Sequence, residues 1–431
     1  MTAMRYREYD TDKDRAAVQR IWREVGWCES GQEEVVDIFA TSGATIVAEL
    51  DGEAECMVTT TGGTMRYLRE DLDLVIVKFV TTGRVGRRQG LAGRLTAAAL
   101  ATAATDGAVV ATLGTFDQGY YDKLGFGTGS YENHVAFDPS HLQISCRARP
   151  PRRLTSDDAA AIHASLTNRQ RGHGSCAITN PQIIRAWLLW HPDSFGLGYY
   201  DPSGELTHFL WFDVTNMRVG PYRVKWMSYQ TNEQFLELMA VIAGLGDQLH
   251  LVHICEPVHI QFQDLLRRPK AEMAARSGSE YEVSMRTGAS WQLRILDLPG
   301  CLKKTHLSCD DLRFNLRLTD PIAGYLDAAG PWHGIAGDYL VTLGPSSSAQ
   351  RVAAPPAASG TARQTGPGAA LGMDPSLPTL RASVNAFSRM WYGVRPATGL
   401  AATDDLCGPA DLLAQLDAAF LLPRPARDCY F

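Results

Sequence analysis

The chain lacks the features that mark a membrane protein or a disulfide-rich secreted protein. None of its apolar runs approaches the ~18 residues that a membrane-spanning helix needs. The first 16 residues are charged and contain no apolar stretch, so we expect no signal peptide. The nine cysteines are scattered and form no C-x-x-C pair, which argues against a disulfide framework and a zinc site. We therefore expect reduced thiols in a cytoplasmic protein that has no membrane partner.

Charge of either sign is also modest. Lys and Arg number 41 against 47 Asp and Glu, which gives a formal net charge of −6. This balance argues against nucleic acid as a partner and mildly favours cationic partners. The chain has 431 residues, of which 45% are hydrophobic. It is too long for one ordinary core, and we expect about three domains.

A strand, a turn with glycine and arginine, and a helix follow one another in the first third of the chain. Leu72–Thr82 is rich in β-branched and apolar residues, which predicts a buried strand. The turn Gly83–Gly90 carries Arg87 and Arg88, and a helix pattern with one apolar face begins at Leu91. Free N–H groups at a helix start, together with two arginines, predict a site for a large anion such as a phosphate. The turn is neither a Walker motif nor G-x-G-x-x-G.

The arrangement Arg87-x-x-Gly90-x-Ala92 after such a strand resembles the acyl-CoA pyrophosphate loop of the GNAT N-acetyltransferases. In that family the strand before the loop bulges, and the pantetheine arm pairs with its exposed backbone. The resemblance implies that acetyl-CoA is the co-substrate. The residues expected to bind it are Val80, Thr81, Thr82, Arg87, Arg88, Gln89, Gly90, Leu91 and Ala92. The alternative is a basic surface turn before a helix.

A second GNAT-like segment follows the next predicted strand, at 108–113. Gly119–Gly127 (GYYDKLGFG) matches the pattern Y-x-x-x-G-F, with Tyr121 four residues before Gly125. In the family a tyrosine here commonly protonates the departing CoA thiolate. A phenol with a pKa near ~10 is a usable proton donor to a thiol whose pKa is near ~8.5. Tyr121 is therefore the predicted general acid, with plain packing as the alternative, and Tyr120 is a predicted packing residue.

The rest of the chain is typical of two further domains. Residues 156–255 repeat the order of helices and strands of the first 150 residues, but no Arg-x-x-Gly-x-Ala follows Lys225–Gln230. We interpret this part as a degenerate GNAT-like domain that forms one wall of the substrate cavity. The sequence after Leu293 resembles the sterol-carrier-protein-like fold. Pro345–Gly368 is a low-complexity stretch, for which we expect a mobile insertion.

Together these parts resemble the Eis-like (enhanced intracellular survival) acetyltransferases over the whole chain. The expected fold class is α+β, with tandem GNAT folds and a sterol-carrier-protein-like domain. The N-terminal GNAT domain spans 1–148, the degenerate one 149–292 and the third domain 293–431. The resemblance implies acetyl-CoA-dependent N-acetylation of an amine, such as a polyamine, an aminoglycoside or another natural product. It also implies a homo-oligomer, expected to be a hexamer.

The chain ends on two aromatic residues, which favour a pocket over water. A buried Phe431 would bring its α-carboxylate with it, and the Eis-like resemblance implies that this group is the general base in the first domain's active site. Its ordinary pKa near ~3.5 is too low for an efficient base, so burial has to raise it. Relatives carry an acidic residue just before the terminal phenylalanine, where this chain has Tyr430. The change favours a less cationic or a larger aromatic amine.

Aromatic faces and carboxylates are what an ammonium group needs. The family uses an aromatic and an acidic residue after its first helix, and Trp27 and Glu29 fall at about those places. With Phe39 and Tyr430 they make up the predicted substrate site, although Trp22 and Phe39 also fit a core.

Two alternatives to an acetyltransferase remain open. The first is an acyltransferase of the same fold that uses a longer or different acyl donor in antibiotic biosynthesis. The second is a non-catalytic lipid or small-molecule binding protein in which the GNAT site is vestigial. The intact Arg87–Ala92 loop and Tyr121 argue against the second alternative.

Overall fold

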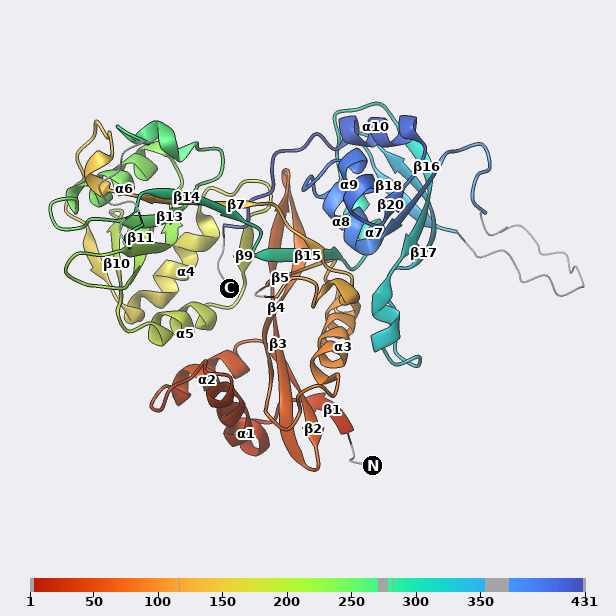
Figure 1. Ribbon diagram of the computed structural model, residues 1–431, viewed down its shortest axis with the longest axis horizontal. Helices are drawn as coiled ribbons and strands as arrows, with labels where there is room; N and C mark the ends of the chain where they lie inside the picture. Colours follow the sequence, from red (N-terminus) through yellow and green to blue (C-terminus); the bar gives the residue numbers. More distant parts are fainter. Residues whose placement is uncertain (1–3, 116, 270–277, 281, 353–371, 429–431) are drawn as a thin grey trace, which may run out of the picture.

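The computed structural model describes residues 4–115, 117–269, 278–280, 282–352 and 372–428. Its strands form three sheets, and helices pack against each of them (Figure 1). The predicted mixture of helices and strands is confirmed. Tyr430, Phe431 and positions 353–368 of the low-complexity stretch lie outside the described residues.

The first sheet is built around a long antiparallel hairpin, β3–β4. Its order is β1-β2-β3-β4-β5-β15-β6, and β9 pairs with β3. The run Leu74–Val77 is buried on both faces, because its alternate side chains join the clusters of α1 and α2 on one face and of α3 on the other. The elements are β1 (Met4–Glu8), α1 (Thr11–Glu24), α2 (Glu33–Thr41), β2 (Ala44–Leu50), β3 (Glu53–Tyr67), β4 (Glu70–Thr82), α3 (Leu91–Thr105), β5 (Val110–Gly114), β6 (Gly127–Thr128), β9 (Cys176–Ile178) and β15 (Trp291–Ile295).

The second sheet has the order β14-β7-β13-β12-β11-β10-β8. Helix α6 packs on one face of it, and α4 and α5 pack on the other. The chain exchanges strands between the first two sheets, because β7 lies in the second sheet and β15 returns to the first. The elements are β7 (Glu132–Phe137), β8 (Arg152–Leu154), α4 (Ala159–Asn168), α5 (Gln182–Trp190), β10 (Ser194–Tyr200), β11 (Leu206–Val214), β12 (Tyr222–Ser228), α6 (Asn232–Gly244), β13 (Val252–Cys255) and β14 (Ser284–Gly288).

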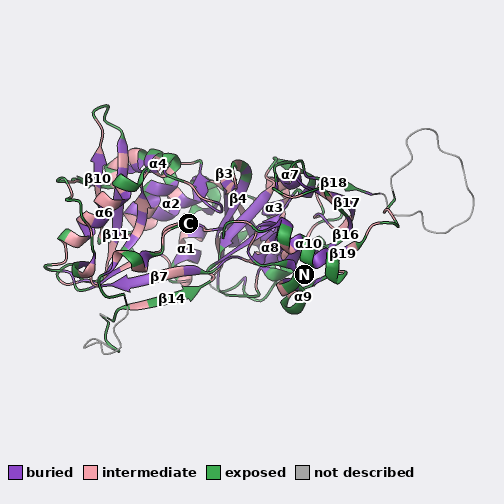
Figure 2. Cartoon of the chain, turned by 90° about the horizontal axis from the view of Figure 1, so that it is seen from above, coloured by how far each residue is buried: buried purple, intermediate pink, exposed green. Residues whose placement is uncertain are grey.

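The third sheet, ordered β18-β17-β16-β19-β20, shares a continuous buried core with the first (Figure 2). Arg294 of β15 forms a wholly buried ion pair with Asp320 (2.7 Å), which joins the two parts. Strand β18 lies within the stretch expected to be a mobile insertion, so that part of the expectation is wrong. The elements are α7 (Leu298–Lys303), β16 (Leu312–Thr319), β17 (Gly337–Leu343), β18 (Ser348–Arg351), β19 (Thr379–Ser383), α8 (Val384–Trp391), α9 (Ala397–Thr403), β20 (Leu406–Cys407) and α10 (Ala410–Ala419).

Neither a membrane span nor a metal site is found within the described ranges. Every helix there is too short or too polar to cross a bilayer. The same residues contain no group of His, Cys, Asp and Glu side chains that could hold a metal ion.

Candidate active site

Strand β4 carries an irregularity where it approaches the arginine-containing loop. Its register with β3 shifts between Met57 and Thr59, so that Phe79 and Val80 together face a single residue of β3. Phe79 adopts a left-handed backbone conformation with a φ of 49°, which is uncommon for a bulky residue. This geometry is a β-bulge, the feature that the GNAT resemblance implies for this strand.

Strands β4 and β5 separate just before the bulge. They pair in parallel over Leu74–Val77 and Val110–Leu113. Beyond these pairs no described strand lies against this edge of β4, while β15 follows the other edge of β5 as far as Gly114. Backbone groups along this edge of Phe79–Thr82 are therefore free of strand pairing. An extended ligand that carries amides can pair with such an edge as an additional strand.

The loop that follows β4 is held at its start. The N–H of Gly83 donates a hydrogen bond to the backbone oxygen of Glu55 (2.7 Å). The N–H of Arg84 donates to a carboxylate oxygen of Glu24 (2.7 Å), and this bond is the largest contribution that lowers the pKa of that carboxyl. These bonds fix where the loop leaves the sheet.

The end of the same loop is open. Helix α3 starts after Gly90, which has a φ of 76° and gives no side-chain cap to the first N–H groups. A Cβ atom placed on Gly90 would meet no other atom within 4 Å, so space is free in front of the helix. The exposed side chains of Arg87, Arg88 and Gln89 precede it. Free N–H groups, the positive end of the helix dipole and two guanidinium groups together fit a phosphate-bearing ligand.

The other predicted co-substrate residues lie at the end of β4 and in the first turn of α3. Their side chains are buried or half-buried, so these residues would meet a ligand mainly through their backbone. They are Val80, Thr81, Thr82, Leu91 and Ala92.

Tyr121 lies after β5 and is almost wholly buried, with 3% of its surface exposed. Its ring packs edge-on against Tyr120 and Phe126, at centroid distances of 4.9 and 6.1 Å. Burial, and to a smaller extent Tyr120 and Cys56, raises the pKa of the Tyr121 hydroxyl above its usual range. The hydroxyl therefore stays protonated at neutral pH, as a general acid must. The apolar cluster around it includes residues of β4, β5 and α3, namely Val77, Leu113 and Leu91.

Aromatic side chains surround the bulge on the opposite face of the sheet. The ring of Phe79 lies 4.4 Å from that of Phe39 and 4.9 Å from that of Trp22, centroid to centroid. Helix α5, which belongs to the second sheet's layer, adds Trp187 and Trp190, each 5.5 Å from Phe39. These two tryptophans were not predicted from the sequence. Their spacing of three residues on a helix, which places them on one face, was the available signal.

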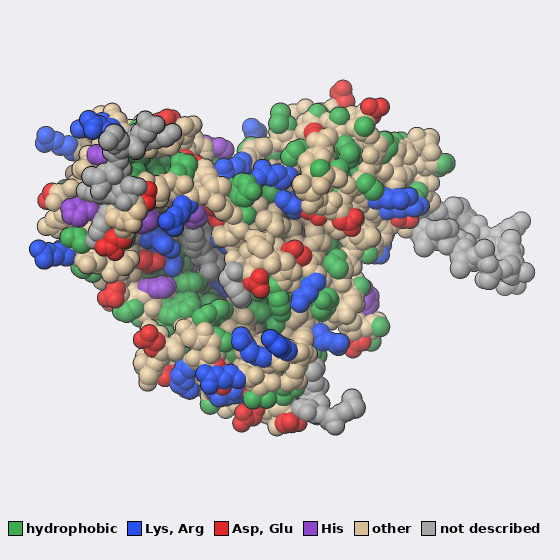
Figure 3. Space-filling view, viewed as in Figure 1, with side chains coloured by type: hydrophobic (Ala, Val, Ile, Leu, Met, Phe, Trp, Pro, Cys, Tyr) green, Lys and Arg blue, Asp and Glu red, His purple; other side chains and the backbone are tan. Residues whose placement is uncertain are grey.

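The predicted substrate residues differ in how they lie around these rings. Trp27 is half-buried, and its backbone oxygen accepts a hydrogen bond from the indole N–H of Trp190 (3.0 Å). Phe39 is fully buried and supports the other rings. Glu29 is exposed on the loop between α1 and α2, and Tyr430 lies outside the described residues. Hydrophobic side chains gather in a recess between the second-sheet part and the α1–α2 layer (Figure 3).

The C-terminal segment returns to the region between the first two sheets. The N–H of Ala426 donates a hydrogen bond to the backbone oxygen of His173 (2.9 Å). The guanidinium of Arg427 lies 3.7 Å from the carboxylate of Glu132. A Cβ atom placed on Gly114 would lie 3.5 Å from the same guanidinium. The segment thus reaches the end of β5, where the first sheet opens.

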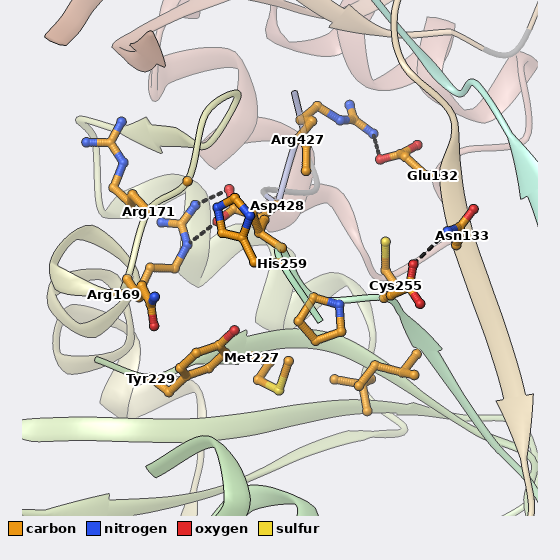
Figure 4. Close-up of a pocket in the computed structure, with 18 of the residues that line it drawn as sticks. Glu132, Asn133, Arg169, Arg171, Met227, Tyr229, Cys255, His259, Arg427 and Asp428 are labelled. Atoms are coloured by element: carbon orange, nitrogen blue, oxygen red, sulfur yellow. Dashed lines mark hydrogen bonds and ion pairs between the residues drawn. The ribbon is translucent and has the colours of Figure 1, made fainter. Parts of the chain in front are cut away.

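Asp428 is the last described residue and is firmly held. Its carboxylate accepts two hydrogen bonds from Arg169, at 2.5 and 2.9 Å, and one from the hydroxyl of Ser175 at 2.8 Å (Figure 4). Phe431, the predicted base, follows three positions later, outside the described residues. A role for the chain end was predicted from the sequence, but roles for Asp428 and Arg169 were not.

The sequence matches no protein-family model and no curated protein. Solved structures of the same fold nevertheless cover the whole chain. A probable N-acyltransferase of unknown function from Enterococcus faecalis matches 100% of both chains with 15% identity and a TM-score of 0.76. A GCN5-related N-acetyltransferase from Kribbella flavida covers 100% of this chain and 99% of its own, with 15% identity and a TM-score of 0.71.

Eis1 from Mycobacterium abscessus also matches 100% of both chains, with 14% identity and a TM-score of 0.71. The fold is therefore that of GCN5-related N-acetyltransferases, Eis1 among them, as the sequence resemblance predicted. At this identity the likeness concerns the fold alone.

Proposed function

We propose that this protein is an acyl-CoA N-acyltransferase that passes an acetyl group from acetyl-CoA directly to a primary amine. The observation that carries the proposal is the bulged end of β4, open toward β5, which leads into the Arg87–Ala92 loop and α3. The open strand edge fits the amides of a pantetheine arm, and the loop fits a pyrophosphate. Acetyl-CoA supplies the activated acyl group.

Two of the chemical functions that transfer needs come from described residues. The N–H of Val80, at the bulge, is the proposed donor to the acyl carbonyl oxygen, which gains negative charge as the amine attacks. The C–N bond forms and the C–S bond breaks. Tyr121 gives its proton to the leaving sulfur, and the proton lost by the amine finally replaces it.

The proposed base that takes the amine proton is the α-carboxylate of Phe431, acting directly or through water. The course of the preceding segment supports this role. Arg427 lies beside the end of β5, and Asp428 is anchored three residues before Phe431. Because an α-carboxyl ordinarily has a pKa near ~3.5, the surroundings of the chain end have to raise it.

The proposed acceptor is a primary amine of a polyamine, an aminoglycoside or another natural product. The half-buried rings of Trp27, Trp187 and Trp190 beside the bulge support an acceptor with a flat or aromatic part, because such rings bind both cations and aromatic groups. Tyr430 in place of an acid supports the same preference.

The predicted domain organisation stays part of this proposal. It consists of a GNAT domain at 1–148, a degenerate one at 149–292 and a sterol-carrier-protein-like domain at 293–431. The parallel pair β12–β13, connected through α6 as β4 and β5 are through α3, supports the degenerate domain. The hexameric assembly and the cytoplasmic location stay predictions.

Release of CoA from acetyl-CoA in the presence of a panel of amines tests the proposal. We expect release that depends on both the amine and the protein. The panel should include a polyamine, an aminoglycoside and an aromatic amine. Malonyl-CoA and a long-chain acyl-CoA, tested in parallel, identify the acyl donor. Absence of amine-dependent release from every donor would refute the proposed reaction.

A further inference from the structure

The second sheet contains an opening that corresponds to the one between β4 and β5. Its parallel strands β12 and β13 pair only through Tyr222–Arg223 and Val252–His253. Strand β7 follows the other edge of β13 as far as Cys255, as β15 follows β5. Beyond the last pair, β12 and β13 line a cavity of about 140 Å³.

This opening does not end in an anion site like that of the first sheet. Helix α6 begins after Thr231, whose hydroxyl accepts a hydrogen bond from the N–H of Gln234 (3.3 Å). The protein therefore caps this helix itself, whereas α3 has no side-chain cap. Nothing in the local sequence replaces the two arginines of the first loop.

The chain's own C-terminal segment lines the same cavity. On the sheet side the cavity is bounded by side chains such as Val224 and Met227 of β12 and Ile254 of β13. Residues 424 and 426–428 also line it. Figure 4 shows Arg427 and Asp428 across the cavity from Met227. The segment thus covers, in the second sheet, the kind of opening that is free for a ligand in the first.

An ion pair between Arg169 and Asp428 holds this segment. It is bidentate, and the Arg169 side chain is only 4% exposed. Arg169 also donates hydrogen bonds to the backbone oxygens of Leu166 and Cys176. The guanidinium is therefore fixed before it meets Asp428, and a pair of this geometry imposes both position and orientation.

We propose that the opening of the second sheet is the binding site for the chain's own C-terminal segment, and that Arg169 and Asp428 are the positioning pair that sets where the chain end lies. The catalytic consequence rests on the proposed function, in which the terminal carboxylate is the base. Three residues span at most about 10 Å. With Asp428 anchored, the proposed base, the α-carboxylate of Phe431, has to lie within about that distance of Asp428. The opening between β12 and β13 then serves catalysis without itself binding either substrate.

The full-length variant Asp428→Asn tests this role, because asparagine keeps the size of the side chain and removes its charge. We expect kcat to fall about 100-fold, the loss typical of a reacting group displaced by about 1 Å. The KM for acetyl-CoA should stay within about twofold, because its site is formed by other elements. The Ala426 amide, bonded to His173, should exchange its hydrogen faster.

The control is Glu237→Gln, which removes another bidentate ion pair of the second-sheet part, with Arg149 at 2.8 and 2.9 Å. It should leave kcat and the exchange of the C-terminal peptide unchanged. Unaltered exchange in Asp428→Asn would overturn the binding site, and faster exchange with unaltered kcat would overturn the positioning role. If the wild-type protein transfers no acyl group, the proposed function fails, and hydrogen exchange alone decides the binding site.

Discussion

Replacing Tyr121 by phenylalanine removes the proposed proton donor and little else. The residue is 3% exposed, and phenylalanine keeps the ring between Tyr120 and Phe126. At most one hydrogen bond is lost, so the free energy of unfolding should fall by no more than about 1.5 kcal/mol. The fold and the acyl-CoA site should therefore survive the change.

The effect on the reaction should be much larger than the effect on stability. A positioned general acid accelerates a reaction by about 10²–10⁴-fold. We therefore expect kcat to fall by that factor in Tyr121→Phe, which corresponds to roughly 3–5 kcal/mol of activation free energy. The KM for acetyl-CoA should change little, because the hydroxyl acts on the leaving sulfur.

The assay is steady-state release of CoA, measured from pH 6 to about pH 10. The upper limit is chosen because an ordinary phenol has a pKa of about 10. Because burial raises the pKa of Tyr121, the wild-type rate should show no alkaline decline from loss of its proton within this range. The variant should be slow throughout. A kcat within about threefold of the wild type would refute Tyr121 as the general acid and leave it a packing residue.

Three further predictions concern the co-substrate loop, packing and acid stability. Replacing Arg87 and Arg88 together by alanine should weaken acetyl-CoA binding about 100-fold, because two charge-assisted hydrogen bonds are lost; calorimetric titration measures this, and unchanged affinity contradicts the phosphate site. Gly125→Ala should lower the free energy of unfolding by about 2–5 kcal/mol, because φ is 82° and the new Cβ would lie 2.7 Å from two neighbouring side chains. Gly204→Ala, with a φ of 88° in open space, should lower the free energy of unfolding by only about 1–2 kcal/mol. Equal losses for the two variants in urea denaturation would contradict a steric clash at Gly125. Burial lowers the pKa of His173 to about 4, below its unfolded value near ~6.5. The unfolded chain then binds more protons between these values, so stability should fall as pH drops from 6.5 to 4, and His173→Gln should lack this contribution.

The first sheet's site could be predicted from sequence because its elements are local. Leu72–Thr82 is a single apolar run, and the loop with Arg87 follows it directly, so pattern and resemblance led to the observed strand, turn and helix. The exact place of the bulge, at Phe79, depends on the register with β3 and is not encoded in the apolar pattern.

Contacts between distant parts of the chain escaped prediction. Arg169 and Asp428 are 259 residues apart, and neither has a neighbouring sequence motif that announces the other. Trp187 joins the rings around Phe79 only because the second-sheet part packs against α2. Such pairs follow from how the sheets pack together.

The proposed reaction moves an acetyl group from CoA directly to an amine nitrogen. Mass spectrometry of a reaction with isotopically labelled acetyl-CoA tests it most directly, because it follows the label itself. We expect labelled N-acetyl product in an amount equal to the CoA released, and no label on the protein before the amine is added. Label retained covalently on the protein, or CoA released without N-acetyl product, would contradict direct transfer.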